Sequence, residues 1–164
     1  MPSDINTPLT EFSTTKYHPL GYKFENGQDT YRYAYNAGAD TLTAGEILGS
    51  SQTTPQYGYL SGTAADITDG TSSTSVPMGM AMSAAPTANY FWCQTGGPNR
   101  KAITTDGNIT EGDMWGFAGT TSPDGTILPI ADGTEENAGG VALKTDTGTT
   151  SAVGEISIGC EKFW

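Results

Sequence analysis

The segment TLTAGEIL, Thr41–Leu48, has a counterpart later in the chain, NITEGDMW, Asn108–Trp115. Both segments contain an apolar residue, a threonine, any residue, a glycine, an acid and then two apolar residues. In such a phrase the glycine supplies a bend or bulge just before a strand. The acid beside it can accept backbone N–H bonds in the turn, and the two apolar residues then enter the sheet. We therefore predict the same strand-entry turn at two places in the chain.

A second phrase is also repeated: GMAM, Gly79–Met82, and GVAL, Gly140–Leu143, both read glycine, apolar, alanine, apolar. Small residues in a strand allow a neighbouring backbone to approach closely. Each phrase is followed, after a polar turn, by a strand-like run that holds a cysteine, and YAYNAGAD and KAITTDGN are similar segments before the first phrase. From this common order we predict two similar β units, about residues 31–97 and 100–164, that pair in one domain because a single unit would leave unpaired strand edges.

The pattern of the whole chain predicts an all-β fold, a small β-barrel or β-sandwich. Short apolar or alternating runs are separated by turn signals about every ten residues, and no window free of Gly or Pro has helical periodicity. The turn signals are Asx-Gly pairs, which close hairpins because Asn and Asp tolerate positive φ and Gly adopts it freely. These pairs are Asn26-Gly27, Asp69-Gly70, Asp106-Gly107, Asp124-Gly125 and Asp132-Gly133.

Residues 1–30 differ from the remainder, 31–164, and we predict that they form an extended N-terminal arm. This segment has three prolines, many polar residues and few paired apolar positions. It is nevertheless too apolar for a solvated tail, because it contains Phe12, Tyr17, Leu20, Tyr22 and Phe24. We expect the arm to lie either on its own β domain or on a neighbouring subunit.

Charge and composition exclude several classes of partner. The 164 residues include 18 acids against 7 bases, for a net charge of −11. An acidic surface repels phosphate backbones and anionic lipid, so we expect neither a nucleic-acid nor a membrane partner. The N-terminus has no basic region followed by an apolar stretch, and no window approaches ~20 consecutive apolar residues. We therefore expect a protein that is synthesised in the cytoplasm, or one that leaves it by a route that the chain does not encode.

The residues that usually carry catalysis are sparse. The one histidine, His18, precedes a proline and has no evident base partner, and a single histidine cannot build a multi-histidine metal site. The acids lie mostly in turns, where they serve turn chemistry. A calcium site from two such loops is conceivable, but no spacing matches a known calcium loop. A carboxylate pair for glycoside hydrolysis would need a cleft that the sequence does not place. We expect no enzymatic activity, no cofactor and no metal site.

The cysteines and aromatic residues give the remaining candidates. Cys93 and Cys160 lack metal-ligand spacing, and we predict two buried thiols, while a disulfide would need their Cα atoms within ~7 Å. Trp92 and Trp115 are predicted core residues. Trp164 at the C-terminus is predicted to lie in the core or in a subunit interface. The predicted interface residues are Phe12, Tyr17 and Tyr22 on the arm, Tyr57 and Tyr59 in PQYGYLSG, and Trp164.

Residues 79–158 resemble small β proteins that decorate the heads of tailed bacteriophages. The shared pattern is a Gly-apolar-Ala strand, an aromatic strand that ends in glycine, an Asp-Gly turn, a Gly-Asp before a strand, and a second Gly-apolar-Ala strand. These elements are here Gly79–Met82, Tyr90–Gly97, Asp106-Gly107, Gly112-Asp113 and Gly140–Leu143. The segment CQTGGPNRK is more polar than the pattern.

The resemblance implies a structural virion protein. Its members are capsid decoration or cement proteins, which bind the major capsid protein on the outer capsid surface, stabilise the head and commonly form homotrimers. The alternative is a carbohydrate- or receptor-binding β module of a phage fibre or tail, suggested by the Tyr57 and Tyr59 loop and by the acidic turns.

Overall fold

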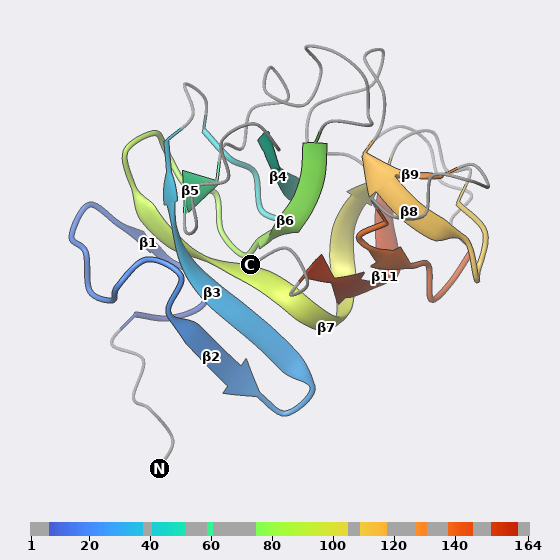
Figure 1. Ribbon diagram of the computed structural model, residues 1–164, viewed down its shortest axis with the longest axis horizontal. Coiled ribbons are helices and arrows are strands. Elements are labelled where there is room, and N and C mark those ends of the chain that lie inside the picture. Colours follow the sequence, from blue (N-terminus) through green and yellow to red (C-terminus); the bar gives the residue numbers. More distant parts are fainter. Residues whose placement is uncertain are drawn as a thin grey trace.

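The computed structural model describes residues 7–37, 41–51, 59–60, 75–104, 109–117, 127–130, 138–145 and 152–160. In this part of the chain the regular elements are β-strands joined mostly by antiparallel pairing, which confirms the all-β prediction (Figure 1). The strands are β1 (Phe12–Ser13), β2 (Lys23–Asn26), β3 (Asp29–Asn36), β4 (Ile47–Ser51), β5 (Tyr59–Leu60), β6 (Ser75–Ala81), β7 (Tyr90–Thr104), β8 (Met114–Phe117), β9 (Ile127–Pro129), β10 (Gly140–Val141) and β11 (Ala152–Gly159). The division into an arm and two β units remains a prediction.

Strand β7 links the two halves of the sheet. Its first half pairs antiparallel with β3, from Tyr90 opposite Tyr35 to Gly96 opposite Thr30. Its second half pairs antiparallel with β11, where Thr104 lies opposite Ala152. Figure 1 shows β7 as one long curved ribbon that runs from the β1–β3 side of the molecule to β11. One strand therefore serves both halves of the chain.

Two strand pairs with the same register flank β7. In the first strand pair, β4 with β6, Ile47 lies opposite Met80 and Leu48 lies opposite Gly79. In the second strand pair, β8 with β10, Met114 lies opposite Val141 and Trp115 lies opposite Gly140. The repeated phrases therefore pair in the same way in both halves. The end of TLTAGEIL pairs with the start of GMAM, and the end of NITEGDMW pairs with the start of GVAL.

The turn before the first strand pair is closed by four hydrogen bonds. The Glu46 N–H donates to the Thr43 carbonyl at 3.1 Å, and the Glu46 carboxylate Oε2 accepts from the Thr43 N–H at 2.6 Å. The Gly45 N–H donates to the Ala81 carbonyl at 2.9 Å, and the Ala81 N–H donates to the Glu46 carbonyl at 2.8 Å. Gly45 has φ +96°, a left-handed conformation that favours glycine.

The turn before the second strand pair repeats these bonds atom for atom. The Asp113 N–H donates to the Thr110 carbonyl at 2.9 Å, and Asp113 Oδ2 accepts from the Thr110 N–H at 2.8 Å. Gly112 donates to the Ala142 carbonyl at 3.0 Å, and Ala142 donates to the Asp113 carbonyl at 2.8 Å. Gly112 has φ +95°. The predicted strand-entry turn is confirmed at both places, with the acid in the predicted role.

The two cysteines do not occupy equivalent positions, although each follows a repeated phrase. Ala81 of the first strand pair lies opposite Cys93, whereas the equivalent Ala142 lies opposite Ile156. Cys160 is four residues further along, and its Sγ lies 3.8 Å from the Gly139 carbonyl oxygen. Both thiols are fully buried, which confirms the prediction of buried thiols.

The middle of β7 contains buried polar side chains that form hydrogen bonds with one another and with the backbone. Gln94 is 1% exposed, and its Nε2 donates to the carbonyl oxygens of Gly96 and Pro98, each at 3.1 Å. Asn99 donates through Nδ2 to Gln94 Oε1. These bonds satisfy buried groups where β7 changes partner from β3 to β11. The segment that departs from the decoration-protein pattern is therefore the join between the two halves.

Three clusters of buried side chains form the core. The first joins both strand pairs, because Ile47 and Met80 pack with Trp115, Ile127 and Ile156. The second lies on the other face of the first strand pair and contains Leu48, Met78, Ala81, Phe91, Cys93 and their neighbours. The third contains Tyr31, Tyr33 and Trp92 and is covered by the N-terminal segment. The predicted burial of Trp92 and Trp115 is confirmed.

Candidate interaction surfaces

The N-terminal segment, residues 7–22, lies on the sheet of its own chain. Strand β1 pairs antiparallel with the start of β7, with Phe12 opposite Phe91 and Ser13 opposite Tyr90. The Trp92 indole Nε1 donates to Thr7 Oγ1 at 3.2 Å, although the two residues are 85 positions apart in the sequence. Backbone pairing and a buried side-chain bond therefore hold this segment at two points.

An aromatic cluster under this segment surrounds His18. The imidazole stacks on Tyr22 with ring centroids 5.1 Å apart, meets the edge of Tyr33 at 5.1 Å and lies 5.3 Å from Trp92. His18 is 9% exposed, and its Nε2 has no hydrogen-bond partner within the described residues. Burial lowers the pKa of His18, because a charged imidazole is poorly solvated there. His18 therefore anchors the segment as a neutral ring, a role that its sequence context did not indicate.

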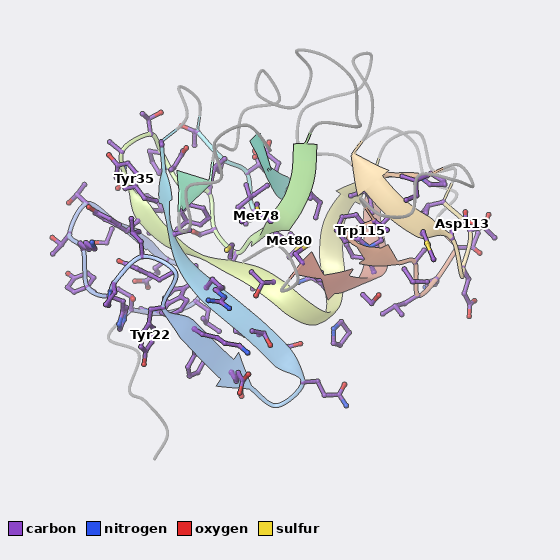
Figure 2. All side chains as sticks on the ribbon, in the orientation of Figure 1. Tyr22, Tyr35, Met78, Met80, Asp113 and Trp115 are labelled. Carbon is purple, nitrogen blue, oxygen red and sulfur yellow. The ribbon has the colours of Figure 1, made fainter. Side chains whose placement is uncertain are left out.

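Of the predicted interface residues on the arm, two present their rings to solvent. Phe12 is 48% exposed and Tyr17 is 49% exposed. The Tyr17 backbone is nevertheless held, because its N–H donates to the Tyr33 hydroxyl at 3.3 Å. Tyr22 is partly buried against the aromatic cluster (Figure 2). We call Phe12 and Tyr17 the arm surface.

The other predicted interface residues are placed less fully. Tyr57 and Trp164 lie outside the described residues, and Tyr59 begins β5, where its backbone lies opposite Tyr35 in a parallel pairing. The Tyr35 ring contacts Tyr90, with centroids 4.9 Å apart. The structure therefore brings the Tyr59 position to the end of β3, and β7 and β3 lie between β5 and strand β1 of the arm surface.

A second apolar surface was not predicted from the sequence. Met114 is 42% exposed and Leu143 is 44% exposed. Met114 lies opposite the partly buried Val141, so their side chains share one face of the second strand pair. Ile130 covers Gly116 on the same face, and its N–H donates to the Met114 carbonyl at 3.0 Å. We call Met114, Ile130, Val141 and Leu143 the outer face.

The sequence contained a signal for the outer face, namely consecutive apolar residues whose side chains point to opposite faces of a strand. Trp115 and Ala142 are buried at 0% and 2% exposed, and each is flanked by an apolar residue that points the other way. A strand with apolar residues on both faces usually has both faces covered. The sequence therefore already contained a second apolar face on these strands.

The described residues include no group of three or more His, Cys, Asp or Glu side chains that could hold a metal ion. Within the same residues, no helix has the length and apolar character needed to cross a membrane. The two surfaces that remain are apolar and partly exposed, which suits contact with another macromolecule.

Comparisons with known proteins give little further identification. No protein-family model matches the chain, and no curated protein matches it. A solved structure with some likeness is the base of the head fiber protein gp8.5 of bacteriophage phi29, at 16% sequence identity and a TM-score of 0.46, over 78% of this chain and 92% of that chain. A likeness this weak does not establish a shared fold or function.

Proposed function

We propose that the chain is a structural virion protein that decorates the outer surface of a phage capsid. In this role it binds the major capsid protein as a homotrimer and stabilises the head, as a cement protein does. The proposal is supported by the resemblance of residues 79–158 to head-decoration proteins. It is also supported by two exposed apolar surfaces on an acidic all-β chain.

The observation that carries the proposal is the arm surface. Phe12 and Tyr17 expose about half of each ring on a segment that β-pairing and the Trp92 bond hold in place. Aromatic side chains provide large contact areas with few rotatable bonds and are enriched in the centres of interfaces. Because the segment is already ordered, little conformational entropy is lost when the surface becomes covered. This surface is therefore suited to an interface of the assembled virion.

Binding to capsids tests the proposal directly. Capsids are prepared from the phage whose genome carries this gene, after the gene has been deleted. Purified protein is mixed with these capsids, and the bound fraction is measured by sedimentation. The wild-type protein should bind, and the double variant Phe12→Ser, Tyr17→Ser should bind about tenfold or more weakly, as expected for two interface residues. Thr14→Ala, at an exposed polar position of the same segment, is the matched control.

The outcomes separate the function from the surface. Absence of wild-type binding would overturn the decoration function, whereas unchanged binding of the double variant would remove only the role of the arm surface. Point substitutions are preferable to deletion of residues 1–24. Deletion would also remove His18 and Tyr22 from the aromatic cluster and so would destabilise the fold.

One observation favours the second candidate, a carbohydrate- or receptor-binding module of a fibre or tail. Tyr35 and Tyr90 form a partly buried aromatic pair beside the Tyr59 position of β5. Flat aromatic faces can stack on apolar ligand surfaces. Immunogold labelling of virions distinguishes the candidates, because label over the head supports decoration and label confined to fibres or the tail supports the module. A glycan array with Tyr35→Ala as the control variant then tests sugar binding.

A further inference from the structure

Equivalent positions of the two strand pairs differ sharply in exposure. Ile47 and Met80, opposite one another in the first strand pair, are 0% and 1% exposed because they pack against Trp115 and Ile127 of the other half. The equivalent Met114 is 42% exposed, and Val141 opposite it is only partly buried. The second strand pair therefore keeps the apolar residue types of a covered face, but no other described residue covers that face fully.

The same relationship holds two residues further along, at the last position of GMAM and GVAL. Met82 is partly buried and packs against the first core cluster. The equivalent Leu143 is 44% exposed. Because the two strand pairs share their turn, register and residue types, the difference lies in what covers them and not in the strands themselves.

We propose that a second copy of this chain covers the outer face, and that the arm surface of the neighbour is the group that contacts it. Among the described residues, the large hydrophobic side chains that are exposed are Phe12 and Tyr17 in the arm surface and Met114 and Leu143 in the outer face. The two surfaces lie at opposite ends of the molecule, as Figure 1 shows for β1 and β8. Two different complementary surfaces on one chain give a head-to-tail contact, which generates a ring where the rotation closes.

Charge favours this pairing over contact between two outer faces. Residues 7–32 contain three acids and three bases, namely Glu11, Glu25 and Asp29 with Lys16, Lys23 and Arg32. The described charged residues beside the outer face are Glu111 and Asp113 with Lys144. Two outer faces would bring like charges together, which opposes association, whereas Lys16 beside Tyr17 suits the acidic rim at Glu111 and Asp113.

This inference deepens the homotrimer part of the proposed function by naming the two surfaces that meet. It differs from a direct contact between the arm and the capsid. If the arm surface binds a neighbouring copy, its loss weakens capsid attachment because fewer linked chains bind together. Leu143→Glu should then weaken attachment as much as Phe12→Ser, Tyr17→Ser does.

The first test measures mass in solution, where no capsid is present. Light scattering over a wide range of protein concentration should give a multiple of the 17.1 kDa chain for the wild type. Leu143→Glu should shift association to at least tenfold higher concentration, and Phe12→Ser, Tyr17→Ser should have the same effect. Ala84→Glu, which places a charge at an exposed position outside both surfaces, should leave the mass unchanged. Circular dichroism checks that every variant is folded.

The second test identifies which surfaces meet. Phe12→Cys and Leu143→Cys are prepared separately, mixed and treated with a short bismaleimide cross-linker. The native thiols Cys93 and Cys160 are fully buried, so they contribute little background. Head-to-tail contact predicts a cross-linked pair that contains one chain of each variant, with no product from either variant alone.

Three results would overturn the inference. A product from Leu143→Cys alone would show that two outer faces meet. A wild-type monomer at every concentration without any cross-linking would show that no second copy covers this face. A monomer that still binds capsids would overturn the contact between copies and leave the decoration function in place.

Discussion

The first and second strand pairs have the same local structure in two different surroundings. The turn bonds of Glu46 and Asp113 match, and Gly79 and Gly140 have nearly the same φ, +155° and +156°. Yet the first strand pair is buried on both faces, and the second is buried on one. A short repeated phrase therefore specifies hydrogen bonds and register, while the burial of its outward side depends on what packs against it.

The largest expected effect is at the glycines that start the second phrases. A Cβ on Gly140 would lie 1.9 Å from the Ser157 carbonyl oxygen, whereas a Cβ on Gly79 would lie 2.7 Å from the Gln94 carbonyl oxygen. Gly140→Ala should lower the free energy of unfolding by more than about 4 kcal/mol or prevent folding. The reason is that neither the Gly140 backbone nor the Ser157 backbone can move away freely. Gly79→Ala should be less severe, at about 2–4 kcal/mol.

Urea unfolding followed by tryptophan fluorescence measures both glycine variants. Gly21→Ala is the control, since Gly21 also has positive φ, +77°, but its Cβ would meet nothing within 4 Å. That variant should lose only the conformational term of about 1–2 kcal/mol. Equal losses for all three variants would show that close packing against β7 and β11 is not what requires glycine in the second phrases.

The next comparison substitutes equivalent side chains on the outward sides of the strand pairs. Ile47→Ala removes a fully buried side chain and should lower the free energy of unfolding by about 2–5 kcal/mol. Met114→Ala acts on a side chain that is 42% exposed, and in the monomer it should lower this free energy by less than about 1 kcal/mol. Chemical denaturation of dilute protein measures the difference. A similar loss at both positions would mean that the outer face is covered in the monomer.

Some of this arrangement could be predicted from the sequence, and the reason is locality. The turns were predictable because Thr43, Gly45 and Glu46 interact within a few residues of one another. The pairing across the sheet was not predictable, because the register of β11 depends on distant strands. That register places Ile156, and not Cys160, opposite Ala142.

The interaction surfaces show the same limit. Phe12 and Tyr17 were predictable as apolar residues on an otherwise polar segment, and both are exposed. The anchor role of His18 was not predictable, since it depends on how the segment folds back onto Tyr33 and Trp92. The outer face was missed because consecutive apolar residues such as Met114 and Trp115 indicate that both faces of a strand are apolar. They do not show which face is left exposed.

The third prediction removes the acid from each turn. Glu46→Ala and Asp113→Ala each remove a carboxylate that accepts a backbone N–H bond, from Thr43 at 2.6 Å and from Thr110 at 2.8 Å. Both bonds are exposed to solvent, so each variant should lower the free energy of unfolding by about 0.5–1.5 kcal/mol. The losses should agree within error in thermal unfolding experiments. A loss at one turn only would show that the repeated phrase has different energetic roles in the two halves.

The N-terminal segment covers only one end of the sheet, and pH tests how it is held there. The pKa of His18 is lowered below its usual 6.5, so the unfolded chain binds a proton at higher pH than the folded chain does. The stabilisation should be complete above about pH 6.5 and should decrease as pH falls through the lower folded pKa. In His18→Phe, which keeps a ring among Tyr22, Tyr33 and Trp92, this part of the pH dependence of unfolding should disappear. An identical pH profile in both proteins would contradict the burial of a neutral imidazole.

The smallest effect concerns the loop before β7, which has no counterpart among the repeated phrases. Ala88 has φ +61°, and its N–H donates to the Asn36 carbonyl at 2.9 Å. Left-handed conformation costs a residue with a Cβ about 1–2 kcal/mol, while glycine increases the entropy of the unfolded chain by about 0.4–1 kcal/mol. Ala88→Gly should therefore raise the free energy of unfolding by about 0.5 kcal/mol. Ala84→Gly, on an exposed residue without positive φ, should lower it by a similar amount, so the opposite signs in matched denaturation curves test whether this bend is strained.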